Sequence, residues 1–212
     1  MNSEILIQNS ARRWWVTLPT MWLPLLASFF YFIWYPGTVF GNSFYSGIKV
    51  FLLIWPLIAV GWILREKFVD LSRPKEHRKS ILVGTVFGLT VVGLLMFLLK
   101  ATPLAFLIDD NRAQIAKMIE GLGVVEHFLL FAFFLSVIHS ALEEFFWRWF
   151  VFGQLRKIVA MPAAHILAAM GFASHHIVIL SQFFPLGWAF ALGTCVGIGG
   201  AMWSWMYQKH NS

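Results

Sequence analysis

The chain has 212 residues, of which 59% are hydrophobic and only 12% are charged, and its net charge is +6. Charged residues make up about a quarter of a typical soluble domain, so this composition excludes an ordinary soluble globular protein. The basic residues lie in short segments between apolar stretches, which indicates membrane topology and not nucleic-acid binding. A single cysteine, Cys195, excludes an internal disulfide framework.

The apolar residues are grouped into stretches long enough to cross a bilayer, for which a helix needs about 20 residues. Six stretches qualify, at about 18–36, 45–64, 81–99, 124–155, 161–181 and 186–207. The fourth is longer than a crossing requires, so we expect it to tilt or to project into the cytoplasm. Residues 101–123 are amphipathic and predict an external loop with a short interfacial helix. The sequence thus predicts an all-α fold, a polytopic transmembrane helical bundle that forms a single membrane domain over residues 1–212.

Basic residues predict the orientation of the bundle. The loop 65–80 holds six of them and is therefore expected in the cytoplasm. Alternation from this loop places both termini in the cytoplasm, so we expect a multi-pass protein of a cytoplasmic (inner) membrane. Arg12 and Arg13 run directly into a full-length span without a small-residue cleavage site, which predicts a retained signal anchor.

Ionisable side chains inside spans are unusual, because a charge at mid-bilayer costs about 2.5–3.5 kcal/mol on insertion scales. Spans four and five nevertheless contain a group of them: His139, Glu143, Glu144, Arg148, His175 and His176. Lys49, near the outer end of span two, is expected to extend its ammonium group towards the interface.

Helix geometry relates these side chains. Glu144 and Arg148 are four residues apart and can form an ion pair on one face, while His139 and Glu143 form a second row about 100° away. Glu143 lies thirteen residues before Arg156, and His176 lies fifteen residues after Met161. At 1.5 Å per residue, both are roughly 20 Å from the cytoplasmic ends of their helices, so they are predicted at the same depth.

Several of these residues also have a purely structural interpretation. Glu144–Arg148 can serve as a buried pair that locks span four against its neighbours. Adjacent histidines point in different directions on a helix, so we expect only one of His175 and His176 to face Glu143. The glycines of span six, at 193, 197, 199 and 200, are best explained by close helix packing.

A carboxylate and a histidine that converge in a low-dielectric site can activate a water molecule. His139, Glu143 and His176 also have the donor chemistry to hold a divalent metal such as zinc, but no spacing requires one. A proton or ion path would use similar residues. The residues alone therefore predict a buried Glu/His site and leave its reaction open.

Two short motifs resemble a known family. Residues 143–148 read Glu-Glu-Phe-Phe-Trp-Arg, an EExxxR motif, and Phe172 to His176 match FxxxH in the following span. Together with the Gly-rich last span, they resemble the CPBP intramembrane proteases, also called the CAAX-protease or Abi family. The resemblance covers roughly 120–210, so residues 124–212 correspond to the catalytic core and 1–123 add further spans.

The resemblance implies a glutamate-dependent endopeptidase, CAAX-protease-like, that cleaves a peptide bond in or near the bilayer. Carried over by position, Glu143 would activate water with help from His176, and Glu144, held by Arg148, would orient the site. Phe172 would pack beside the histidine and, with His175 and His139, would border the substrate. Eukaryotic relatives trim prenylated CAAX proteins, so a membrane-associated peptide or protein in the lipid bilayer is the expected partner, and nucleic acid is not.

One family feature has no counterpart here. The family's third motif, a histidine followed four residues later by Asn or Asp, is expected on a further span, whereas the chain ends at His210-Asn211-Ser212. Either the sequence is truncated or this member lacks the motif. The second interpretation favours a catalytically inactive member that acts as an immunity factor or membrane scaffold. A proton-coupled transporter that uses Glu143 and His176 as a relay is the remaining, least favoured alternative.

Overall fold

The structure of the chain is a computed structural model that describes residues 3–68, 77–102, 104–121 and 123–210. Every regular element in this part of the chain is a helix, as predicted. Arg73 and Lys75 of the predicted basic loop, and Asn211 and Ser212, lie outside the described residues.

Six helical segments within the described ranges are long and apolar enough to cross a membrane, and they confirm the predicted multi-pass bundle. The first is α1 (Ser3–Phe29) with its π-helical end η1 (Phe30–Trp34), and the second is α2 (Val39–Ile58) with η2 (Ala59–Ile63). The third is α3 (His77–Ala101), and the last two are α8 (Met161–Leu180) and α9 (Leu186–His210). The first helix begins well before the predicted residue 18, because its polar first turns extend beyond the apolar stretch.

The fourth span alternates between helix types. It runs through η3 (Val125–His127), α5 (Phe128–Phe133), η4 (Phe134–His139), α6 (Ser140–Glu144), η5 (Phe145–Phe152) and α7 (Gly153–Leu155). The segments η4 and η5 are π-helical, so the short α6 lies between two π-helical stretches. Hydropathy cannot reveal such changes, because a π-helix and an α-helix can bury the same side chains.

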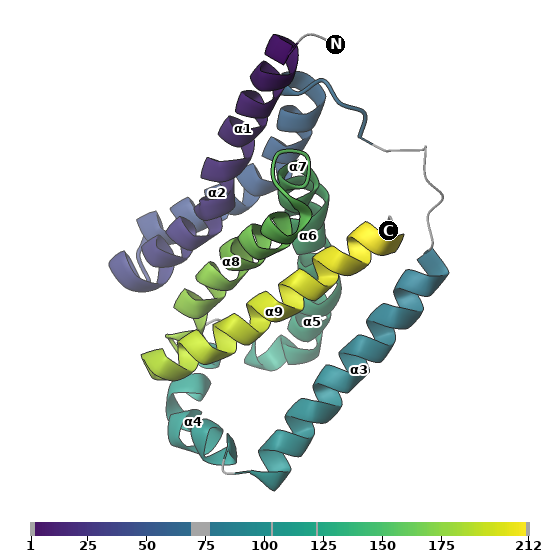
Figure 1. Cartoon of the computed structure of the whole chain (residues 1–212). Helices are drawn as coiled ribbons and strands as arrows, with labels where there is room; N and C mark the ends of the chain where they lie inside the picture. Colours follow the sequence, from purple (N-terminus) through teal and green to yellow (C-terminus); the bar gives the residue numbers. More distant parts are fainter. Residues whose placement is uncertain (1–2, 69–76, 103, 122, 211–212) are drawn as a thin grey trace.

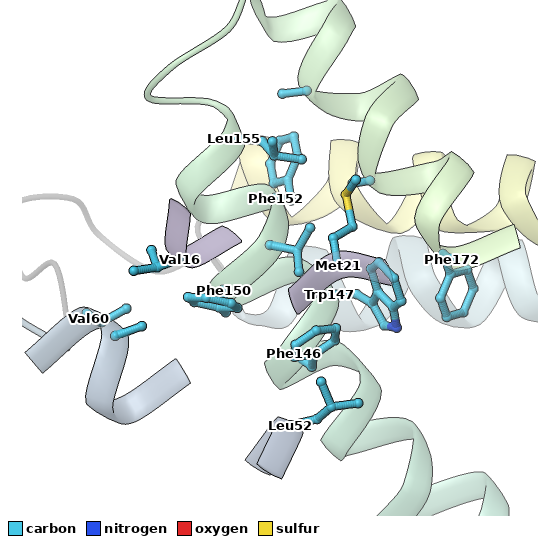
Figure 2. Close-up of a cluster of buried hydrophobic side chains, with 14 residues drawn as sticks. Val16, Met21, Leu52, Val60, Phe146, Trp147, Phe150, Phe152, Leu155 and Phe172 are labelled. Carbon is cyan, nitrogen blue, oxygen red and sulfur yellow. The ribbon is translucent and has the colours of Figure 1, made fainter. Parts of the chain in front are cut away.

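The core surrounds η5, from which Phe146, Trp147, Phe150, Val151 and Phe152 are all buried. Side chains of α1, α2 and α8 pack around this segment (Figure 2). Burial from water does not drive helices together inside lipid, so close packing has to hold them.

Helices α8 and α9 lie side by side (Figure 1), and glycines allow this close approach. A Cβ atom on Gly197 would lie 2.8 Å from the Ala173 Cβ atom, and one on Gly200 would lie 2.8 Å from the Phe172 ring. Gly193 likewise faces Ile177, whereas a Cβ atom on Gly199 would meet nothing within 4 Å. The packing interpretation is therefore confirmed for Gly193, Gly197 and Gly200.

At each end of the bundle, a segment that connects two helices contacts neighbouring parts of the chain. At one end, Glu66 after α2 binds Arg13 of α1 and, at 2.7 Å, Lys157 after α7. Burial raises the pKa of Glu66, but hydrogen bonds from Arg13, Lys157 and Gln154 outweigh it and lower the pKa to about 2. We call these four residues the inner-end cluster.

At the opposite end, α4 (Leu104–Gly121) contacts the turn between α8 and α9 through a 3.0 Å hydrogen bond from Gln114 to the Gln182 carbonyl. The predicted interfacial helix is therefore longer than expected, because helix-forming residues continue through most of 101–123. Helix α3 stands to one side of the bundle (Figure 1), and none of its residues is buried.

Candidate active site

The two glutamates of the EExxxR motif lie on α6, between η4 and η5. π-Helical segments are frequent at functional sites, because each one shifts the side chains that follow it around the helix axis. Glu143 is partly buried, whereas the Glu144 side chain is 48% exposed. The two neighbouring carboxylates therefore meet different surroundings.

Glu144 forms the predicted ion pair with Arg148, whose Nη1 atom lies 3.1 Å from Glu144 Oε1. The Arg148 side chain is only 2% exposed, and its guanidinium lies 4.7 Å from the centre of the Phe172 ring on α8. Its other terminal nitrogen donates to the Gly200 carbonyl of α9 at 3.4 Å. Arg148 thus joins the fourth span to both following helices, in agreement with the predicted locking role.

Glu143 is the point where three histidines converge. Its Oε1 atom lies 3.4 Å from His139 Nε2 on the same span and 3.8 Å from His175 Nε2 on α8. Ligand atoms of Glu143, His175 and His176 all lie within 4.8 Å of one another. The predicted equal depth of Glu143 and His176 is therefore confirmed.

The expectation that only one of the adjacent histidines would face Glu143 is wrong. The rings of His175 and His176 lie with their centres 4.2 Å apart, and each has a ring nitrogen within 4.8 Å of a Glu143 carboxylate oxygen. His175 is held in place by Trp147, whose ring stacks on it at 5.7 Å and an interplanar angle of 1°.

The backbone sets the hydrogen-bonding role of His176. Its Nδ1 atom lies 2.8 Å from the Phe172 carbonyl oxygen. A carbonyl oxygen only accepts, so Nδ1 carries the hydrogen and donates. In the neutral ring, Nε2 is then the acceptor and is free to bind a water proton. Phe172 also packs beside this ring, with the two centres 4.6 Å apart.

Glu143 lines two cavities. The first measures about 230 Å³ and is bordered by His139, His175 and apolar residues of α1 and α2. The second measures about 660 Å³ and is bordered by Glu144, Arg148, Phe172 and aromatic residues of η5 and α9. A substrate in either cavity would reach the Glu143 carboxylate.

Residues 125–212 match the family model described as Rce1-like, Type II CAAX prenyl endopeptidase Rce1-like. This part of the chain is similar to that family. The match confirms the resemblance to the CAAX proteases that the two motifs indicate. Comparison with curated proteins and with solved structures finds no match for this chain.

The Rce1-like segment contains all seven residues that the sequence indicates for the site. One further side chain that borders the site comes from outside this segment. Lys49, on α2, lines the first cavity together with His139, Glu143 and His175. Its ammonium group lies over the Tyr45 ring, one turn nearer the start of α2, so its extension towards the interface stays a prediction. Its depth offered a signal: it lies sixteen residues before Arg65, or about 24 Å from the inner end of its helix, close to the depth of Glu143.

The donor atoms of the Rce1-like segment fit a divalent cation. Glu143, His175 and His176 supply one carboxylate oxygen and two ring nitrogens, a donor set common at catalytic zinc. The hydrogen bond from His176 Nδ1 to a carbonyl is the usual outer-shell partner of a histidine ligand. Such an ion would polarise a carbonyl as a Lewis acid. His139, in the metal set considered from the sequence, is replaced by His175 in this cluster.

Proposed function

We propose that the protein is an intramembrane endopeptidase, CAAX-protease-like, in which Glu143 activates water to hydrolyse a peptide bond. The observation that carries this proposal is the convergence of His175 and His176 on Glu143, which itself lines two cavities. The Rce1-like match of residues 125–212 gives the reaction class. The proposed substrate is a membrane-associated peptide or protein, and the proposed location is a cytoplasmic membrane with both termini in the cytoplasm.

The reaction needs one base and a group that steadies the water. The Glu143 carboxylate accepts a proton from water, and the hydroxide adds to the substrate carbonyl carbon. The carbon–nitrogen bond then breaks, and the proton held by Glu143 passes to the leaving nitrogen. His176 Nε2 accepts the second water proton as a hydrogen bond, which orients the oxygen towards the carbonyl.

The other residues have positioning roles in this proposal. His139 and His175 contact the Glu143 carboxylate from two sides and fix its direction. The Glu144–Arg148 pair anchors α6 to α8 and α9, and Phe172 packs against both Arg148 and His176. The aromatic walls of the larger cavity suit an apolar or lipid-attached part of the substrate.

The test compares cleavage of a prenylated, fluorogenic CAAX peptide by the purified wild type and by Glu143→Gln and His176→Ala. General base catalysis contributes about 10²–10⁴-fold, so we expect losses of kcat in this range, largest for Glu143→Gln. The matched controls are Glu120→Gln and His127→Ala, which change exposed residues far from α6 along the chain and should retain wild-type rates.

Equal rates in the wild type and both site variants would refute the catalytic assignment. The same cleavage assay in the presence of a chelator distinguishes direct activation of water by Glu143 from metal-assisted hydrolysis. The proposed glutamate mechanism predicts that activity survives removal of divalent cations.

A further inference from the structure

The smaller cavity has one cationic side chain in an otherwise apolar wall. Lys49 of α2 lines it, while Leu52, Leu53, Leu142 and Phe146 supply apolar surface (Figure 2 shows Leu52 and Phe146). Glu143 lies at the same cavity, flanked by His139 and His175. The cavity therefore combines a carboxylate base, apolar walls and a separate ammonium group.

The Lys49 ammonium group has no carboxylate within ion-pair distance among the described residues. It lies over the face of the Tyr45 ring, 5.3 Å from the ring centre, and Glu143 acts on it only from beyond ion-pair distance. Glu143 is already contacted by two histidines. A lysine at this depth in a span is costly, and such residues mark ligand or ion sites when they face the interior of a bundle.

The size and chemistry of the cavity restrict what can pair with Lys49. About 230 Å³ corresponds to roughly eight water molecules at about 30 Å³ each, which is enough for the end of a short peptide. The apolar walls suit apolar side chains, and the ammonium group needs an anion. A peptide that ends in apolar residues and a free carboxylate has both features.

We propose that Lys49 binds the C-terminal carboxylate of the peptide that the reaction releases, and so determines which peptides are cleaved. This inference rests on the proposed peptidase function and adds a specificity determinant from α2, outside the Rce1-like segment. The peptide runs from the scissile bond at Glu143 towards Lys49, with its apolar side chains against Leu52 and Leu53. Cleavage places a new amino group at one end of the released peptide and leaves its carboxylate at Lys49.

We predict that the protein cleaves a peptide with a free C-terminal carboxylate faster than the same peptide with a neutral C-terminus. A hydrogen bond between two charged groups is strong in a dry site, and a neutral substrate leaves the ammonium group desolvated and unpaired. A site built for one polar group rejects a substrate that lacks it. We expect about ten- to hundredfold higher kcat/KM for the free carboxylate than for the amide.

The experiment uses the full chain in lipid–detergent micelles with three prenylated peptides that differ only at the end. The first has a free C-terminal carboxylate, the second has a C-terminal amide, and the third has an amide but ends in Asp, which returns a carboxylate on the side chain. The variants are Lys49→Met, which keeps length without charge, Lys49→Arg, which keeps charge, and Lys100→Met as the exposed control.

The supporting result is a wild-type preference for the free carboxylate that disappears in Lys49→Met, persists in Lys49→Arg and is unchanged in Lys100→Met. If the peptide that ends in Asp is cleaved as fast as the peptide with the free C-terminal carboxylate, this would support a carboxylate-binding site. It would also show that a side-chain carboxylate can replace the C-terminal one.

If the wild type cleaves the peptides but shows no preference for the free carboxylate over the amide, the assignment of Lys49 is overturned and the peptidase proposal stands. This outcome is informative even if Lys49→Met fails to fold. A preference that survives in a folded Lys49→Met would also overturn it. Wild type that cleaves none of the three peptides would refute the proposed function, and the Lys49 assignment with it.

Discussion

The third and fourth spans are both long apolar helices, but they meet their surroundings differently. The third is the more apolar of the two, with a mean hydropathy of 2.5 against 1.7 for the fourth. On η5, six of eight side chains are buried against α1, α2, α8 and α9. On α3, no side chain is buried. Its Phe87 ring packs edge to face against the Trp203 ring of α9, with the two ring centres 5.1 Å apart. The more apolar helix is therefore the less buried one, so packing and not hydropathy determines which span forms the core.

The difference shows how a membrane protein holds a site in place. Lipid solvates α3 as well as protein would, so apolar residues alone do not place a helix in the core. Arg148 and the glycines of α9 provide the specific contacts that lipid cannot replace. We expect substitutions in the packed region to be costly and matched substitutions on α3 to be tolerated.

The largest effect is expected for Glu144→Gln. The change keeps the side chain's shape but leaves the buried Arg148 guanidinium without its charged partner. Breaking a fully buried pair from one side costs about 3–5 kcal/mol. Because Glu144 is 48% exposed, we expect the lower end, about 3 kcal/mol, which thermal unfolding in detergent should show as a fall in Tm.

The double variant Glu144→Gln/Arg148→Met provides the control for this prediction. It removes the unpaired charge together with its partner, so it should be more stable than Glu144→Gln alone. A double variant as unstable as the single one would mean that the shape of Arg148 matters more than its charge.

A smaller effect is expected from adding one methyl group at the contact between α8 and α9. In Gly197→Ala the new Cβ atom would meet the Ala173 Cβ atom at 2.8 Å and the Ala169 carbonyl oxygen at 3.3 Å. Neither neighbour is a flexible side-chain end, so the helices must separate, at a cost of about 1–3 kcal/mol.

The matched change on the third span is Gly88→Ala, where a Cβ atom would meet nothing within 4 Å. Alanine favours helix over glycine by up to about 1 kcal/mol, so this variant should be as stable as the wild type or slightly more stable. Equal destabilisation by both substitutions would contradict the contrast between the two spans.

The smallest effect concerns Glu66 of the inner-end cluster, which lies after the second span. The pKa of Glu66 is about 2, below its ordinary value of 4.5, so its contribution to stability is present above pH 4.5 and is lost as the pH falls towards 2. After solvent screening we expect about 1 kcal/mol. Tm measured from pH 6 to pH 2 should fall less steeply in Glu66→Gln than in the wild type, and parallel curves would exclude this role.

The sequence predicts the parts of this structure that depend on length and spacing. Apolar length locates the six spans, spacing of four pairs Glu144 with Arg148, and helix rise places Glu143 and His176 at one depth. These predictions hold because rise per residue and bilayer thickness vary little between proteins.

Spacing within one helix cannot show which face meets a neighbouring helix. For this reason the sequence did not place Lys49 at the cavity or both His175 and His176 at Glu143, since each depends on the rotation of one helix against another. The stacking of Trp147 on His175 has the same origin. The depth of Lys49 in the second span is close to that of Glu143 in the fourth, and this match is the sequence feature that indicates Lys49.

The π-helical segment η5 determines the direction in which the carboxylates of Glu143 and Glu144 point relative to the buried half of the same span. One residue added or removed in a helix turns everything beyond it by about 100°. A chain that lost a single residue between 149 and 152 would keep its hydropathy profile and the motif residues Glu143, Glu144 and Arg148. The carboxylates would nevertheless turn relative to the buried residues that follow the deletion, so a relative with such a deletion would keep every side chain of the proposed site and lose their arrangement.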